Sequence, residues 1–248
     1  MNVPRFYHQR GFTLIELAIV LVIIGVLVGS FLGTLGARID TTKRAETRDE
    51  LEVIKTALLG YAFSAEEGGP YLPCPCTTDC DIDTANPQAG LETRGAGGTC
   101  DKYYGDLPWG TLGLKPSDAW NSLYKYWVDP KLSAGDGAFD LKVRGSGKIK
   151  TRSPDGTATS MMANHVAAVV FTHGKNGYGG LSVDGVPRPA IPAGNVDEAE
   201  NNDGDAEFVS RTPTPVGATT PGGEFDDIVF WISDYELKAR LVETKLLP

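Results

Sequence analysis

Glu16 is the only ionisable side chain in an apolar run that extends from Phe12 to Ala37. A run of this length, folded as a helix, is enough to cross a hydrocarbon layer of about 30 Å. A carboxylate among lipid tails costs roughly 2.5–3.5 kcal/mol on insertion scales, so such a residue is a functional candidate that needs a cation. We therefore predict that Glu16 pairs with a positively charged group. The alternative is a plain anchor whose glutamate snorkels to the membrane surface.

A second group of carboxylates lies far along the chain, in a segment rich in glycine and proline. Oxygen ligands of this type are those that Ca²⁺ prefers in proteins, so the segment is a candidate calcium site. A solvated acidic loop is the alternative interpretation. The residues are Asp197, Glu198, Glu200, Asp203 and Asp205.

All four cysteines fall in one loop-like stretch between residues 66 and 105, which is too long for a compact domain unless something cross-links it. In an oxidising compartment an even number of cysteines predicts disulfides. A Cys74–Cys76 bridge would be strained. The pairing is therefore Cys74–Cys80 with Cys76–Cys100, or Cys74–Cys100 with Cys76–Cys80. A zinc site is the alternative, but this spacing is not that of a standard zinc ribbon.

No catalytic set emerges from the sequence, and we expect a protein that is not an enzyme. His165 and His173 have no nucleophile elbow of the G-x-S-x-G type to serve. The cysteines show no Cys–His signature of thiol catalysis. The net charge of −9 also argues against nucleic acid as a partner.

The elements that must position these residues begin with one long helix. No proline occurs between Phe12 and Pro70, and beyond the apolar run hydrophobic residues recur on one helical face. We predict a single helix over residues 12–63, whose first half spans the membrane and whose second half packs against a globular domain. A helix followed by strands predicts an α+β fold, with the helix on an antiparallel sheet.

Strands are predicted at residues 123–128, 138–143, 166–172, 207–211 and 227–233. Residues 166–171 are apolar on both faces, so this strand should be central, with the long helix on one side. Residues 233–247 predict a terminal helix, because Ser233 and Glu236 have the spacing of a capping box. Leu237 and Leu241 of that helix should lie against the sheet.

The residues Gly11-Phe12-Thr13-Leu14-Ile15-Glu16-Leu17 resemble the processing signature of type IV pilins and of the pseudopilins of type II secretion. The basic leader ends at Gly11, before the apolar run, whereas a secretory signal peptide is cleaved after it. The resemblance implies that prepilin peptidase cuts between Gly11 and Phe12 and methylates Phe12. It also implies that Glu16 meets the new α-amino group of Phe12 in a neighbouring subunit during filament assembly.

The turn from Gly174 to Gly180 resembles one in major pseudopilins, where a strand runs into a glycine-rich turn and then reaches Asp-x-Asp-Ile and a tryptophan. Asp226, Asp227, Ile228 and Trp231 occupy the later positions here. That loop holds calcium in the family, so the resemblance implies oxygen ligands from Asp227, Asp226 and backbone carbonyls near Gly174. The acidic segment lies in the insertion between the turn and Asp226.

The resemblance implies three parts: a leader (1–11), a transmembrane and assembly segment (12–37) and a periplasmic or extracellular globular part (38–248). Arg5 and Arg10 precede the span, so the leader should be cytoplasmic, in a single pass through the bacterial inner membrane. We expect a structural subunit that assembles with other pilins or pseudopilins, in a type IV pilus, a secretion pseudopilus or a DNA-uptake apparatus. The alternative is a membrane-anchored periplasmic binding or enzymatic domain.

Overall fold

The computed structural model describes residues 12–64, 70–82, 86–135, 139–153 and 155–246, without the side chains of residues 28 and 30–35. The chain divides into two compact units, one up to Lys43 and one from Arg44 to Pro248, which we call the head. The first element, α1 (Leu14–Ser64), runs from one unit into the other as a continuous helix. This confirms the single long helix expected from the absence of proline.

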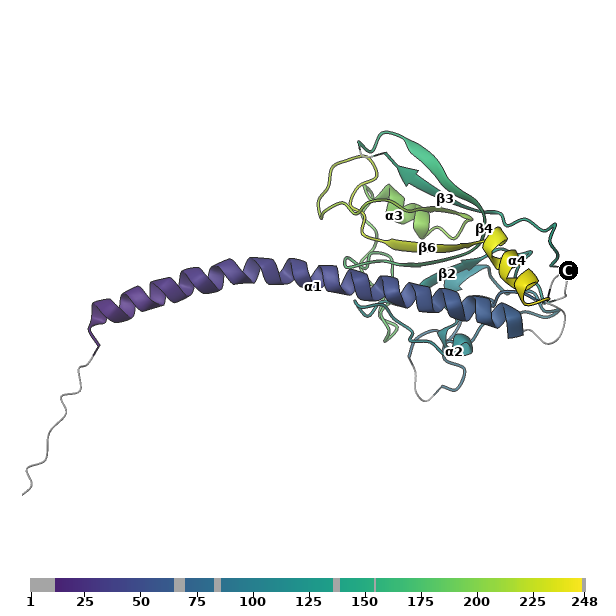
Figure 1. The fold of residues 1–248 in the computed structure, drawn as a ribbon, viewed down its shortest axis with the longest axis horizontal. Helices are drawn as coiled ribbons and strands as arrows, with labels where there is room; N and C mark the ends of the chain where they lie inside the picture. Colours follow the sequence, from purple (N-terminus) through teal and green to yellow (C-terminus); the bar gives the residue numbers. More distant parts are fainter. Residues whose placement is uncertain (1–11, 65–69, 83–85, 136–138, 154, 247–248) are drawn as a thin grey trace, which may run out of the picture. The chain divides into compact units, whose positions relative to one another are not determined.

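The head is built on a six-stranded sheet whose path is β1-β2-β4-β3-β5, with β6 paired to β4. Figure 1 labels β2, β3, β4 and β6 of this sheet. The sheet is mixed, which corrects the expected antiparallel sheet: β3 and β5 run parallel and every other pair is antiparallel. The long connection from β4 to β5 allows the parallel direction. The strands are β1 (Tyr104–Asp106), β2 (Lys125–Val128), β3 (Gly147–Arg152), β4 (Thr159–Thr172), β5 (Glu207–Val209) and β6 (Ile228–Ser233).

The central strand is β4, which pairs with β2, β3 and β6. On one face Ala168 and Val170 belong to a core that includes Leu51 and Leu58 of α1. On the other face Val169 and Phe171 belong to a second core, which includes Trp127 and Phe208. This confirms the prediction of a central strand with the helix on one side, because both faces of the strand are covered by apolar side chains.

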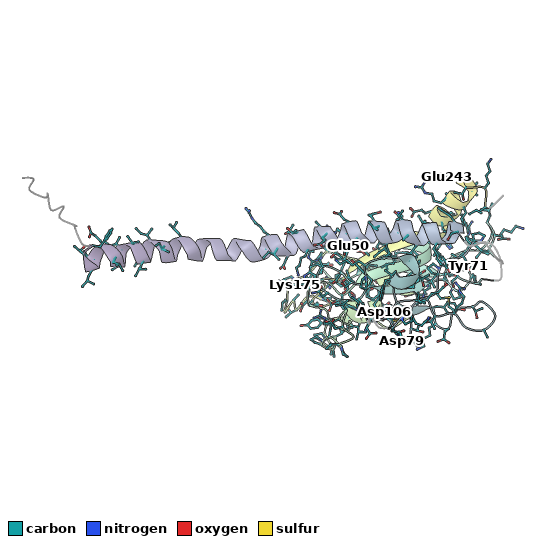
Figure 2. All side chains as sticks on the ribbon, turned by 90° about the horizontal axis from the view of Figure 1, so that it is seen from below. Glu50, Tyr71, Asp79, Asp106, Lys175 and Glu243 are labelled. Carbon is teal, nitrogen blue, oxygen red and sulfur yellow. A yellow bond between two sulfur atoms is a disulfide. The ribbon has the colours of Figure 1, made fainter. Side chains whose placement is uncertain are left out.

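The part of α1 that belongs to the head is also fixed by polar contacts. Glu50, labelled in Figure 2, accepts hydrogen bonds from the Tyr124 hydroxyl at 2.6 Å and from Lys115 Nζ at 2.7 Å. Lys55 lies 2.6 Å from Glu236 at the start of the terminal helix. Apolar packing and these paired charges therefore position residues 44–64 of α1 on the sheet.

The terminal helix α4 (Asp234–Glu243) begins as the sequence predicts. The Ser233 side chain accepts a hydrogen bond from the backbone N–H of Glu236 at 3.1 Å, which satisfies one of the unpaired donors at a helix start. Leu237 and Leu241 are fully buried in the core shared with α1. The Glu236 carboxylate binds Lys55 rather than returning to Ser233, so only half of a capping box forms.

The predicted strand at residues 138–143 is wrong over its described residues, because Asp140 forms a turn there. Its carboxylate accepts the backbone N–H groups of Lys142 and Val143 at 2.7 and 3.1 Å, a local bond that competes with a strand. The sequence also did not indicate β1, β3, the first half of β4, or the short helices α2 (Trp109–Leu112) and α3 (Val196–Asn201).

Two disulfides, Cys74–Cys100 and Cys76–Cys80, cross-link the long segment before β1. This is the second of the two pairings left open by the sequence, and it leaves no described cysteine for zinc. Cys76 and Asp106 also exchange backbone hydrogen bonds at 2.9 Å in both directions, which attach the segment to β1. The segment is therefore held both covalently and by the sheet.

Leu58→Ala is expected to lower the free energy of unfolding of the head by about 2–5 kcal/mol, because it leaves a cavity between α1 and the sheet. Val53, on the same helix, is 58% exposed, so Val53→Ala is the matched control and should change stability by about 0.5 kcal/mol at most. Denaturant unfolding of the full chain in detergent, followed by near-ultraviolet circular dichroism, measures both. Equal losses would contradict the proposed packing of α1.

Candidate functional site

Glu16 lies in the first turn of α1, where it forms a reciprocal capping box with Thr13. One carboxylate oxygen, Oε2, accepts the backbone N–H and the hydroxyl of Thr13, both at 2.8 Å. In return the Thr13 hydroxyl accepts the N–H of Glu16 at 3.3 Å. The T-x-x-E spacing is visible in the sequence and could have predicted this cap. The carboxylate is thereby held at the N-terminal end of the helix, next to the backbone of Phe12.

The other predicted processing residue, Gly11, lies outside the described residues, and Phe12 is the first residue that the structure places. The large apolar side chains described between Phe12 and Leu27 are all exposed, with Leu14 at 92%. An exposed apolar surface of this size is typical of a segment that contacts a partner or a lipid phase. Among the described residues, no helix combines the length and the hydropathy required of a membrane span.

In the head, three carboxylates from distant segments converge. Glu198 belongs to α3, and Asp226 and Asp227 lie directly before β6. One oxygen of each lies within 4.8 Å of the others, and all three residues are less than a tenth exposed. The structure therefore places the two predicted ligands beside a third acid, which belongs to the acidic segment.

The hydrogen bonds around this cluster leave two oxygens without a donor. Asp226 Oδ2 accepts the backbone N–H groups of Lys175 and Asn176, both at 3.0 Å; Lys175 is labelled in Figure 2. Asp227 Oδ2 accepts from the Asn201 amide at 2.8 Å. Asp226 Oδ1 and Asp227 Oδ1 are buried and have no hydrogen-bond partner among the described residues. Buried oxygens of this kind are costly unless something binds them.

The pKa shifts of the two aspartates also favour a bound cation. Burial raises the pKa of Asp226 to about 6, although two backbone N–H groups and Arg44 oppose the shift. Burial also raises the pKa of Asp227 well above its ordinary value, with added repulsion from Glu198 and Asp226. The Arg44 guanidinium is 3.9 Å from Asp226, too far for strong pairing. The arrangement can therefore hold a divalent cation through oxygen ligands.

Gly174 allows Asp226 to take this position. Its backbone has a φ of +57°, and a Cβ atom there would lie 2.4 Å from the carbonyl oxygen and from Oδ1 of Asp226. No side chain fits that space, so the requirement for glycine is both steric and conformational. The turn after β4 is thus in direct contact with the segment before β6.

The remaining acidic residues of the insertion do not join the cluster. Asp197 binds Arg152 and Arg211, and Glu200 lies 3.3 Å from Lys150. Asp203 and Asp205 accept backbone N–H groups within their own turn. Sequence spacing did not distinguish Glu198 from these neighbours.

His165 and His173 have structural surroundings. His173 packs edge-on against Phe171, and burial lowers its pKa to about 3, so the ring is neutral in the folded state at ordinary pH. His165 lies 3.4 Å from the carbonyl oxygen of Gly145. Among the described residues, neither ring is hydrogen-bonded to a serine, a cysteine or an acidic side chain.

Asp227→Asn is expected to raise the Tm of the head at pH 7 in EDTA, with little effect at pH 4. The pKa of Asp227 is raised in the folded state, so its stabilising contribution is present below its unfolded-state pKa, about 4, and is lost as pH rises towards the folded-state value. His173 has the opposite effect, because its pKa is lowered in the folded state and its contribution to stability is lost as pH falls below about 6.5. This effect is the same in the wild type and in Asp227→Asn, so it cancels in the difference between their Tm values.

Differential scanning calorimetry between pH 4 and 7 measures this difference. Asp184 is an exposed carboxylate on another loop, so Asp184→Asn is the matched control and should leave the Tm unchanged across the range. A Tm difference for Asp227→Asn that does not change with pH would contradict the charge repulsion inferred for the cluster.

Comparison with known protein families gives a match at the N-terminal end. The Prokaryotic N-terminal methylation motif matches residues 7–32. No curated protein and no solved structure matches the chain. The motif implies processing by prepilin peptidase and assembly with other pilin subunits, and it indicates a structural subunit. Residues 7–32 are therefore the prepilin-type signal that type IV pilins and pseudopilins share.

Proposed function

We propose that this chain is a minor pilin or pseudopilin, inserted in the bacterial inner membrane and built into a filament through its N-terminal helix. Prepilin peptidase removes residues 1–11 on the cytoplasmic side and methylates Phe12. Residues 12–37 then hold the subunit in the membrane, with the head on the periplasmic side. The methylation motif at residues 7–32 is the observation that carries this proposal.

The apolar run supports the membrane step of the proposal. From Phe12 to Ala37 its composition is that of a lipid-facing helix apart from Glu16. Arg5 and Arg10 before the run favour a cytoplasmic leader by the positive-inside rule. The exposure of the described apolar side chains is consistent with a helix that waits for lipid or for other subunits.

Glu16 supports the assembly step. Its Oε2 atom is occupied by Thr13, whereas no hydrogen bond to Oε1 is found in the described chain. Cleavage after Gly11 creates an ammonium group on Phe12, which a neighbouring subunit can present to that oxygen. The capping box fixes the carboxylate in position before the neighbour arrives, which reduces the entropy lost on pairing. In a medium of low dielectric constant such a pair selects the register of one subunit against the next.

We further propose that the cluster of Glu198, Asp226 and Asp227 binds Ca²⁺. The unpartnered Oδ1 atoms of both aspartates and the Gly174 turn fit an oxygen-ligated cation. When bound, the ion supplies positive charge that offsets the repulsion between the buried carboxylates. Asn176, which donates to Glu198 at 2.8 Å, and Asn201, which donates to Asp227, orient two of the ligands.

Glu16→Ala should insert into the membrane but fail to enter filaments, because the neighbour's Phe12 ammonium loses its partner. Glu16→Gln is the sharper variant: its amide oxygen still accepts from Thr13, so a loss of incorporation isolates the charge. Cell fractionation followed by immunodetection of sheared filaments measures both steps. Mass spectrometry of the wild-type filament subunit should find N-methylated Phe12 as the first residue.

Two results would contradict this function. Normal incorporation of Glu16→Gln would show that the charge is not an assembly contact. An intact leader on the filament subunit would show that the methylation motif is not processed.

Millimolar Ca²⁺ should raise the Tm of the wild-type protein, and at about 100 times the dissociation constant the gain is roughly 2.7 kcal/mol. Asp227→Asn should lose this gain, whereas Asp184→Asn should keep it. Magnesium should act more weakly, because it demands a smaller octahedral site. A Tm that Ca²⁺ leaves unchanged in wild type and in both variants would remove the calcium proposal and leave the filament proposal intact.

A further inference from the structure

We propose that a second site in the head binds a phosphate or sulfate group, in a cleft lined by Arg152 and Arg211. The two arginines follow neighbouring parallel strands: Arg152 ends β3, and Arg211 comes two residues after β5. Lys150 is opposite Val209 in the register of β3 and β5, so continuing that register places Arg152 opposite Arg211. The topology thus brings two guanidinium groups to the same edge of the sheet.

One buried carboxylate separates the two guanidinium groups. Asp197, 2% exposed on its side chain, lies 2.7 Å from Arg152 Nε and 2.6 Å from Arg211 Nε through the same oxygen, Oδ2. Two cations share one anion, so the group carries one positive charge in excess. The Arg211 side chain is only 5% exposed, and its Nε–H is not aligned as a hydrogen bond with that oxygen. A buried donor left in this state favours an additional acceptor.

Both arginines are fixed in place by further contacts, so the site is formed before any ligand binds. Arg152 Nη1 donates to the carbonyl of Gly156 at 3.1 Å. Arg211 Nη2 donates to the carbonyl of Gly223 at 2.9 Å, and its guanidinium lies 4.6 Å from the centre of the Phe225 ring. Side chains held in this way lose little further freedom on binding.

A cleft of about 240 Å³ opens beside the pair. Its lining includes both arginines, Thr151, Thr212 and Thr214. The Thr214 hydroxyl donates to the carbonyl of Gly223 at 2.8 Å, so the hydroxyls of Thr151 and Thr212 are the ones that can donate to a ligand. Asp155 is the acidic residue closest to Arg152 in the sequence. Its carboxylate accepts hydrogen bonds from the Ser153 hydroxyl and from the backbone N–H of Thr157. Guanidinium groups match the oxygens of phosphate and sulfate, and hydroxyls complete the coordination of a tetrahedral anion.

The cleft and the carboxylate cluster are lined by different residues, although α3 contributes to both and the charge of Arg211 opposes the rise in the pKa of Asp227. Asp197 and Glu198 are consecutive in α3, and successive side chains on a helix point about 100° apart. Asp197 therefore faces the arginines, and Glu198 faces Asp226 and Asp227. The inference does not depend on calcium, and its test is made without it.

Isothermal titration calorimetry of the full-length protein in detergent tests the site. The ligands are inorganic phosphate and sulfate, and chloride is the control anion. EDTA is present and the ionic strength is held constant. We expect saturable binding of both anions. Arg152→Gln should weaken binding roughly tenfold or more, because it removes one guanidinium group of the site and the excess positive charge. Lys148→Gln makes the same charge change on the same strand outside the cleft, and should retain wild-type affinity.

Thr212→Val tests the site without disturbing the buried ion network, in case Arg152→Gln does not fold. Losing one hydroxyl donor should weaken binding by about two- to tenfold. Phenyl phosphate distinguishes a phosphate monoester on a larger molecule from the free anion as the ligand. If it binds with the same affinity as inorganic phosphate, the cleft accepts a monoester. If it binds much more weakly, the ligand is the free anion. No binding above chloride, or wild-type affinity in folded Arg152→Gln and Thr212→Val, would overturn the proposal.

Discussion

The burial of β4 on both faces is the constraint on which the head depends. Between Val166 and Thr172 the strand is almost inaccessible to solvent, so both of its surfaces must be covered by other elements. The part of α1 from Arg44 onward and the terminal helix cover one surface, and Trp127 and Phe208 cover the other. Full burial of each large apolar side chain contributes about 1.5–3 kcal/mol, so these two layers are the main source of stability.

The same strand determines where charge accumulates. It ends at Thr172, and the turn that follows brings Gly174 against Asp226 at the start of β6, which pairs with β4. The connection between the turn and β6 contains α3, and it brings the acidic side chains of α3 close to this turn. Asp197 pairs closely with two arginines, whereas Glu198, Asp226 and Asp227 form a buried cluster of like charge. Such a cluster is more typical of a ligand site than of a structural one.

The N-terminal part of the chain follows different physical rules. In the head, the apolar surfaces of the sheet and of the helices meet each other. From Phe12 to Leu27 the apolar side chains are exposed, and the Thr13–Glu16 capping box is the polar feature described there. This segment has no internal core of its own, and an isolated helix is only marginally stable in water, so its stability depends on packing against another apolar surface.

The sequence alone was sufficient wherever the determining interactions are local. The apolar run with its single carboxylate, the continuous helix, the Ser233 cap and the two-faced burial of residues 166–171 could all be read from neighbouring residues, because propensity and periodicity act over a few positions. The predicted strand at 138–143 failed for a related reason. There the Asp140 side chain offered the backbone a local turn that the apolar pattern did not indicate.

Only the tertiary structure decided which distant residues meet. Cysteine spacing left two pairings open, and the attachment of Cys76 to β1 accompanies the pairing that the chain adopts. Sequence spacing could not show that Glu198 joins the carboxylate cluster while Asp197 binds arginine, because successive side chains on a helix point in different directions. The parallel pairing of β3 with β5, which places Arg152 beside Arg211, depends on the path of a long connection. Such contacts join segments far apart in the chain, and the direction and register of that path are set by packing of the whole domain rather than by local pattern.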